Sequence, residues 1–300
     1  MTAGSTRPIM GPMQPDTQVQ LFAIEAEGPR PLPVLAGVSS FDGLYDGLAL
    51  GVYSALCTFE HNKFLYLQQH IERTKRSAQL LGWEYDLDER RLRRALHETC
   101  TAYPFANARV RFDILAEPAT HLGSSSRELV GLMPFLGIPA SYYENGVSVG
   151  FAQTLHRERP LAKTADFAQA RRPYAHKSEH YEFLLLGPEG AILEGTGTNF
   201  YAVKNGIFHT AGSGVLEGIT RKILLDLAVE LGIPLSLEAV TVADIPELEE
   251  AAISGSSRGL LPVVQIEDQV VGNGRPGPIC QRLLSAYNTF VSEQIRLAIE

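Results

Sequence analysis

The sequence predicts a mixed α+β chain of two domains, and three observations support this fold class. A chain of 300 residues, 45% of them hydrophobic and 20% charged, is long enough for two domains with a substantial core. Strand-like and helical runs both occur in the first half, whereas strand-like runs dominate the second half. Glycine and proline interrupt the pattern between the halves, which predicts a connection without regular structure.

The first half holds two predicted helices among three predicted strands. Apolar side chains recur at helical spacing over residues 65–81, and Gly82 supplies the stop. A second helix is predicted over residues 87–101, before the dipeptide Tyr103-Pro104. The strand-like runs cover residues 18–26, 49–58 and 108–115.

The glycine- and proline-rich segment Gly137–Ser141 marks the predicted domain boundary. We expect a small α/β domain over residues 18–136, an interdomain linker over 137–144 and a larger, mostly β-sheet domain over 145–300. Residues 1–17 contain several glycine and proline residues and no continuous apolar stretch, so we expect a mobile tail there.

The second half is predicted to be richer in strands. The dipeptide Asn205-Gly206 between two short apolar runs is a strong hairpin signal, because both residues tolerate positive φ. Helices are predicted over residues 220–231, before Gly232, and over residues 277–299. The strand-like runs cover residues 147–154, 181–186, 191–193, 200–203, 207–210, 251–254 and 260–266.

Charge and cysteine content restrict the class of protein. A formal net charge of -8 argues against a general nucleic-acid binder, whose surface would be basic. The 3 cysteines lie far apart without a C-x-x-C pair, so we expect no disulfide framework, no metal site and a reducing cytoplasm. No run is apolar enough to cross a bilayer, so we expect no membrane partner.

Two motif matches do not carry the chemistry that they suggest. The segment Gly255–Gly259 fits the G-x-S-x-G elbow of hydrolases, but a strand rather than a helix is predicted after it. The last histidine is His209, so no histidine follows the serine as that triad requires. The segment Gly272–Gly277 fits G-x-G-x-x-G, but it follows a predicted hairpin and contains proline, so we interpret it as a loop.

Lys163 and Glu194 are candidates for chemistry on a cofactor that carries an aldehyde and a ring nitrogen. The amine of Lys163 would attack an aldehyde if desolvation or a nearby cation kept it partly deprotonated. Glu194 ends a short predicted strand, where a buried carboxylate would keep a pyridine nitrogen protonated and make the ring an electron sink.

A phosphate would fit the start of the helix predicted after Gly218. The backbone N–H groups of Ile219 and Thr220 point out of that terminus without helical partners. The hydroxyl of Ser256 and the guanidinium of Arg73 would complete the clamp. Taken singly, each of these residues is also a common surface, turn or cap residue, as are Lys163 and Glu194.

The ordered series of motifs resembles the fold-type IV pyridoxal-phosphate enzymes, the class IV aminotransferase family. Lys163 lies 31 residues before Glu194–Phe200 (EGTGTNF). The run Leu216–Arg221 (LEGITR) and the turn Gly255–Ser257, which leads to a proline-containing strand, follow in order. The helix around Arg73 matches too, so the resemblance covers roughly residues 18–290.

The resemblance implies a role for each matching residue. Lys163 would hold the aldehyde of pyridoxal 5'-phosphate covalently and move the proton, and Glu194 would pair with the pyridine nitrogen. Arg73, Ile219, Thr220 and Ser256 would hold the phosphate. Ser257 would offer its backbone N–H to the substrate carboxylate. The small domain of a homodimer would reach the neighbouring active site.

The sequence departs from the family where substrate choice is set. Phe167 and Ala168 occupy the stretch where many branched-chain enzymes place a tyrosine near the phenolic oxygen of the cofactor. Arg258 adds a charge directly after Ser257, where it would favour a substrate with a second acidic group. The alternative is that Arg258 points to solvent or pairs with a carboxylate such as Glu217.

The resemblance implies a transaminase that moves an amino group between an amino acid, with branched-chain types favoured, and a 2-oxo acid such as 2-oxoglutarate. D-amino-acid transamination, elimination from aminodeoxychorismate and a catalytically idle homologue stay open as alternatives.

Overall fold

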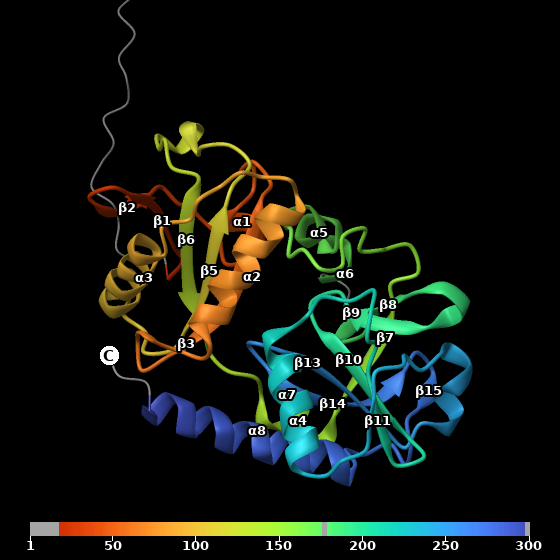
Figure 1. Ribbon diagram of the computed structural model, residues 1–300. Helices are drawn as coiled ribbons and strands as arrows, with labels where there is room; N and C mark the ends of the chain where they lie inside the picture. The colour runs from red at the N-terminus through yellow and green to blue at the C-terminus, as the bar shows by residue number, and fades with distance from the viewer. Residues whose placement is uncertain (1–17, 176–178, 298–300) are drawn as a thin grey trace, which may run out of the picture.

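The computed structural model describes residues 18–175 and 179–297, and it contains two β-sheets with helices packed against each (Figure 1). The mixed α+β class predicted from the sequence is confirmed. The predicted tail, residues 1–17, lies outside the described residues. In Figure 1 the first sheet occupies the upper part of the molecule and the second sheet the lower part.

The first sheet contains six strands, and all of its neighbours pair antiparallel. They are β1 (Gln20–Glu25), β2 (Gly28–Leu32), β3 (Val52–Phe59), β4 (Lys63–Phe64), β5 (Ala108–Ile114) and β6 (Glu128–Pro134). Their order is β2-β1-β6-β5-β3-β4, so β5 lies beside β3 in the middle of the sheet.

Two helices close the core of the first sheet, and both were predicted. They are α2 (Leu67–Leu80) and α3 (Glu89–Ala102), and each bound lies within two residues of its prediction. Ile71 of α2 and Leu96 of α3 are fully buried against apolar residues of the strands. The short helices α1 (Phe41–Leu44) and η1 (Thr120–Leu122) lie in the connections.

Three strands of this sheet were not predicted: β2, the two-residue β4 and β6. β2 contains Pro29 and Pro31, which cannot donate to a ladder, so a sheet tolerates this strand only at its edge. β6 is buried on both faces and shows no alternation. Gly131 within β6 leaves room for α1, since a Cβ there would lie 2.9 Å from the side chains of Leu44 and Tyr45.

The second sheet contains nine strands and closes on itself. They are β7 (Val147–Phe151), β8 (Glu182–Leu186), β9 (Ile192–Gly195), β10 (Asn199–Lys204), β11 (Ile207–His209), β12 (Leu235–Ser236), β13 (Glu250–Gly255), β14 (Gly259–Ile266) and β15 (Gln269–Val270). The path β12-β11-β10-β13-β14-β7-β8-β9 returns to β10 through the pair Asn199 and Glu194.

Two long helices pack on this sheet, α7 (Ile219–Glu230) and α8 (Pro278–Leu297). The predicted hairpin at Asn205-Gly206 is confirmed, and both residues have positive φ. The strand predicted after Gly259 is confirmed as β14, which rules out a hydrolase elbow at that turn. The 3-10 turns η2 (Pro188–Gly190) and η3 (Val242–Glu247) lie in loops.

Between the sheets, β6 ends at Pro134, α4 (Ala140–Asn145) follows, and β7 begins at Val147. The domain boundaries at 136 and 144 stay predictions.

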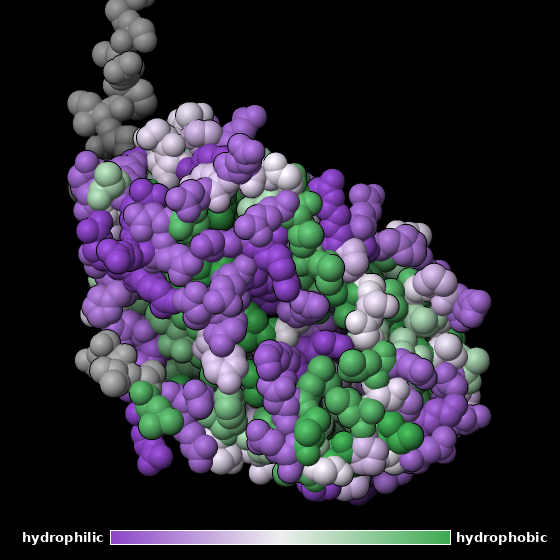
Figure 2. All heavy atoms as spheres, viewed as in Figure 1, coloured by the Kyte–Doolittle hydropathy of each residue, from purple (hydrophilic) through white to green (hydrophobic). Residues whose placement is uncertain are grey.

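Figure 2 shows hydrophilic side chains over most of the face of the molecule that is in view, with hydrophobic atoms gathered over its lower part. Among the described residues, no helix has the length and apolar character needed to cross a membrane.

The segment after β7 returns to the first sheet before it enters β8. Thr164 forms an antiparallel bridge with Val52 at the start of β3. The helices α5 (Ala165–Ala170) and α6 (Arg172–Ala175) follow directly. This return places Lys163 between the two sheets.

Candidate active site

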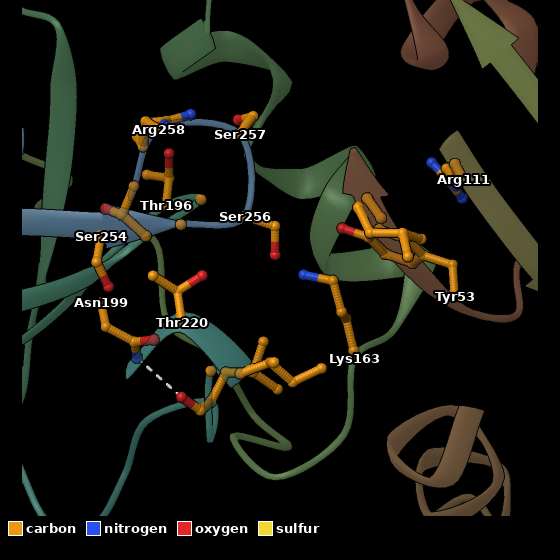
Figure 3. Close-up of a pocket in the computed structure, with 18 of the residues that line it drawn as sticks. Tyr53, Arg111, Lys163, Thr196, Asn199, Thr220, Ser254, Ser256, Ser257 and Arg258 are labelled. Atoms are coloured by element: carbon orange, nitrogen blue, oxygen red, sulfur yellow. Dashed lines mark hydrogen bonds between the residues drawn. The ribbon is translucent and has the colours of Figure 1, made fainter. Parts of the chain in front are cut away.

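A cavity lies where the two sheets meet, and side chains from both sheets line it (Figure 3). The structure brings all eight sequence-predicted residues to this cavity. They are Arg73, Lys163, Glu194, Ile219, Thr220, Ser256, Ser257 and Arg258. In Figure 3 the amine of Lys163 and the hydroxyls of Ser256 and Thr220 point toward its centre.

Lys163 is held through its backbone, which leaves its amine free to face the cavity. Its N–H donates to Ser77 Oγ over 3.0 Å, and its carbonyl accepts from Tyr53 N over 3.1 Å. The side chain is partly exposed to the open cavity, but protein atoms surround the amine. This desolvation, with the charges of Arg73 and Arg171, lowers the pKa of Lys163 to about 7.

Tyr53 faces Lys163 from β3, and its ring centroid lies 4.9 Å from Lys163 Nζ. The guanidinium of Arg111 lies 4.0 Å from the centroids of both Tyr53 and Tyr45, so it is sandwiched between two rings. Arg111 also forms an ion pair with Asp113 at 2.6 Å. Burial opposes ionisation of Tyr53, but the charges of Lys163 and neighbouring arginines outweigh it and lower its pKa to about 7.

Glu194 is 1% exposed and uses both oxygens in hydrogen bonds. Arg157 Nε donates to one oxygen over 2.6 Å, and Leu216 N donates to the other over 3.1 Å. Burial raises the pKa of Glu194, although Arg157 acts in the opposite direction. A carboxylate offers about four lone-pair positions, so Glu194 retains acceptor capacity toward the cavity.

One end of the cavity presents open backbone N–H groups and the buried guanidinium of Arg73. Gly218 precedes the 12-residue helix α7 and no side chain caps it, so its first N–H groups are open. A Cβ at Gly218 would lie 2.1 Å from Asn199 Oδ1, which explains glycine at this close approach. Arg73 is 7% exposed, and its Nε is buried without a partner among the described residues.

Two polar residues orient Arg73. Its Nη2 donates to Ser54 Oγ over 2.8 Å, and Ser54 Oγ lies 3.0 Å from His70 Nδ1. Burial lowers the pKa of His70 well below its ordinary value, so the ring is neutral beside the cation. Arg73 therefore carries its charge toward the cavity without an ion-pair partner among the residues that the structure describes.

Arg258 lies at the tight turn between β13 and β14, where its N–H donates to Gly255 O over 3.0 Å. Its side chain is 21% exposed, and its Nη1 lies 3.4 Å from Glu182. Glu217, the alternative partner considered from the sequence, instead pairs with Arg76 at 2.7 Å. Arg258 is thus paired, but its partner is Glu182 and its side chain lines the cavity.

Among the lining residues that sequence reasoning missed are five large polar side chains. They are Tyr53, Arg109, Arg111, Arg157 and Arg171. Arg157 lies in the charged run His156–Arg159, which is typical of a solvated loop. The arginines of β5 carried a usable signal, because Arg109, Arg111 and Asp113 alternate with apolar residues and so share one face of a predicted strand.

The arrangement fits a ligand with an aldehyde, a ring nitrogen and a phosphate. Lys163 supplies a partly neutral amine, and Glu194 supplies a buried carboxylate. The orphaned Nε of Arg73 and the open N-terminus of α7 supply donors for an anion.

Comparisons with known proteins agree with this arrangement. The model of the Amino-transferase class IV family matches residues 52–266. A Methanocaldococcus jannaschii protein assigned as a branched-chain-amino-acid aminotransferase is 28% identical over 272 residues, 83% of this chain and 89% of the relative. D-alanine aminotransferase from Bacillus licheniformis is 26% identical over 252 residues, 81% of this chain and 88% of the relative.

A solved structure shows the same fold. The crystal structure of a Thermotoga maritima protein assigned as a branched-chain amino acid aminotransferase superposes with a TM-score of 0.74 at 25% identity. The match covers 94% of this chain and 100% of the other.

The ion pair of Arg157 and Glu194 generates a stability prediction. Arg157→Met should lower the free energy of unfolding by about 3–5 kcal/mol, because it leaves a buried carboxylate without its counter-ion. The loss should be larger at pH 8 than at pH 6, since only ionised Glu194 lacks its partner. Urea denaturation of the protein without cofactor measures both.

The matched control is the double variant Arg157→Met/Glu194→Gln, which removes the carboxylate charge as well. It should be more stable than Arg157→Met alone. Equal stabilities of the two variants would contradict the assignment of this pair.

Proposed function

The chain belongs to the class IV aminotransferases, which are pyridoxal-phosphate enzymes, and we propose that it moves an amino group between a branched-chain-type amino acid and a 2-oxo acid such as 2-oxoglutarate. One observation carries the proposal. The amine of Lys163, with a pKa lowered to about 7, lines the same cavity as Glu194 and the open N-terminus of α7.

The cofactor, when bound, supplies an electron sink that stabilises negative charge at the substrate α-carbon. Lys163 would bind the cofactor covalently and then carry the proton to and from that carbon. Glu194 would hold a proton on the ring nitrogen through its remaining lone pairs, while Arg157 keeps the carboxylate in place.

The phosphate would lie against Arg73, Thr220 and Ser256, with the backbone N–H of Ile219 as a further donor. Ser257 would offer its backbone N–H to the substrate carboxylate. Relatives named for branched-chain amino acids support the donor class, whereas the D-alanine aminotransferase leaves the chirality of the donor to experiment.

The lowered pKa of Lys163 predicts how cofactor attachment depends on pH. The rate at which the apo-protein captures pyridoxal 5'-phosphate should rise with pH and level off above about 7, because only the neutral amine attacks. Tyr53→Phe should move this midpoint to lower pH, since ionised Tyr53 raises the pKa of the amine. Stopped-flow absorbance measures the capture rate of the wild type and of Tyr53→Phe. An unchanged midpoint would contradict the electrostatic coupling between Tyr53 and Lys163.

Transamination itself is tested by incubating the enzyme with L- or D-amino acids and 2-oxo acids in pairs. The measured quantity is the formation of the new amino acid and the new 2-oxo acid. Lys163→Ala should lose turnover by several orders of magnitude and retain its fold. Lys75→Ala, at the surface pair with Glu89, is the matched control and should keep normal rates. Pyruvate release from aminodeoxychorismate alone would instead identify a lyase.

We also propose a homodimer in the cytoplasm. Exposed apolar side chains such as Leu35 and Leu136, at 79% and 91% exposure, would gain from burial at an interface. The three cysteines are all unpaired, which fits a reducing compartment. Sedimentation velocity should give a species of twice the chain mass, and a monomer at micromolar concentration would contradict the proposal.

A further inference from the structure

The cavity holds more positive charge than the cofactor and its protein partners neutralise. Among the described residues that line it, seven are cationic and two are carboxylates, Asp42 and Glu194. The cationic residues are Arg73, Arg109, Arg111, Arg157, Lys163, Arg171 and Arg258. Buried cations without partners are costly, so an excess of this size indicates anionic ligands.

Protein carboxylates account for three of these cations. Arg111 pairs with Asp113 at 2.6 Å, Arg157 with Glu194 at 2.6 Å, and Arg258 with Glu182 at 3.4 Å. Under the proposed function, Arg73 serves the cofactor phosphate and Lys163 acts as the nucleophile. The two remaining arginines, Arg109 and Arg171, have neither a carboxylate partner among the described residues nor a role in the proposed function.

Neither Arg109 nor Arg171 forms an ion pair within the part of the chain that the structure describes. Arg171 Nη1 donates to the carbonyl of Thr196 over 2.9 Å, which fixes its position without offsetting its charge. Arg109 extends from β5 with its guanidinium 5.4 Å from the ring centroid of Phe41. Asp42 lines the same cavity and its charge raises the pKa of Arg109, but among the described residues it forms no ion pair with either arginine.

The two arginines approach the cavity from different elements and act on each other. Arg109 comes from the first sheet, and Arg171 directly follows α5. Burial lowers the pKa of Arg109, and the charges of Arg258 and Arg171 lower it further. Arg171 also lowers the pKa of Lys163, so its charge acts on both the amine and Arg109, and all three residues line the same cavity.

We propose that Arg109 and Arg171 form an anion subsite that binds the distal carboxylate of dicarboxylic amino acids and 2-oxo acids. This inference rests on the proposed transamination and specifies one of its two substrates. With the α-carbon at Lys163 and the α-carboxylate at the Ser257 turn, the side chain of the substrate would lie in the cavity that Arg171 and Arg109 also line. An arginine fork matches a carboxylate with two parallel hydrogen bonds, which distinguishes it from an apolar group of similar size.

The test compares 2-oxoglutarate with 2-oxohexanoate, an acceptor of similar length that lacks the distal carboxylate. Arg109→Met and Arg171→Met keep an unbranched apolar side chain and remove the charge. Each should lower kcat/KM for 2-oxoglutarate by roughly 10- to 100-fold, the effect of one lost charge-assisted pair. The value for 2-oxohexanoate should stay within about twofold or rise.

Three controls complete the design. Arg94→Met removes an arginine at the exposed pair with Glu98 on α3 and should leave both acceptors unchanged. Arg109→Lys should recover part of the preference for 2-oxoglutarate. Urea denaturation should show no loss of stability in Arg109→Met, because the native cation has no carboxylate partner.

A binding measurement separates this inference from the proposed function. Calorimetry with glutarate, an unreactive dicarboxylate, should show weaker binding to both methionine variants than to the wild type, and equal binding would overturn the subsite. An equal fall in kcat/KM for both acceptors would also overturn it, since the arginines would then bind the α-carboxylate or act through structure. Glutarate binding that depends on both arginines, without transamination of any pair, would retain the subsite and refute the function.

Discussion

Two backbone hydrogen bonds between the lysine segment and the start of β3 hold the site together. Tyr53 N donates to Lys163 O over 3.1 Å, and Ala165 N donates to Gly51 O over 2.8 Å. Lys163 follows a strand of the second sheet, whereas β3 belongs to the first, so these bonds fix the amine between the sheets. Gly51 shapes this junction, because a Cβ there would lie 2.0 Å from the carbonyl oxygen of Ile114. The catalytic geometry therefore depends on a short pairing that an added methyl group would disturb.

Closure of the second sheet is a second interaction that fixes the geometry of the site. The pair Asn199 and Glu194 joins β10 to β9, which places a buried carboxylate at the cavity wall. The side chain of Asn199 also donates to Leu216 O over 2.8 Å, and Leu216 N donates to Glu194 over 3.1 Å. One network thus fixes the Glu194 carboxylate and the chain that leads into α7. Displacing any member would move both of the features that we propose to hold the two ends of the cofactor.

Much of this organisation was predictable from the sequence, because it is local. All four long helices were predicted: α2 and α7 end before the glycines Gly82 and Gly232, α3 ends before Tyr103-Pro104, and α8 lies at the predicted C-terminal helix. The motif residues also keep their order along the chain. Edge strand β2 was missed because its prolines conceal it. The roles of Arg157 and Arg171 could not be inferred, since only the return of the chain to β3 brings that polar segment beside Glu194. Arg258 lines the cavity, and its role toward the substrate stays a prediction. Its partner, Glu182, depends on tertiary packing.

The arginines of the cavity also couple ligand binding to the chemistry of Lys163. Arg73, Arg171 and Arg157 all lower the pKa of the amine, so an empty cavity favours the neutral form that attacks an aldehyde. A phosphate beside Arg73 and a carboxylate beside Arg171 would offset two of these charges. The amine would then hold a proton more readily at the stage when it must accept one from the substrate. Under the proposed function, one set of cations would first keep the amine neutral for attack and then, once neutralised by ligands, make it a stronger base.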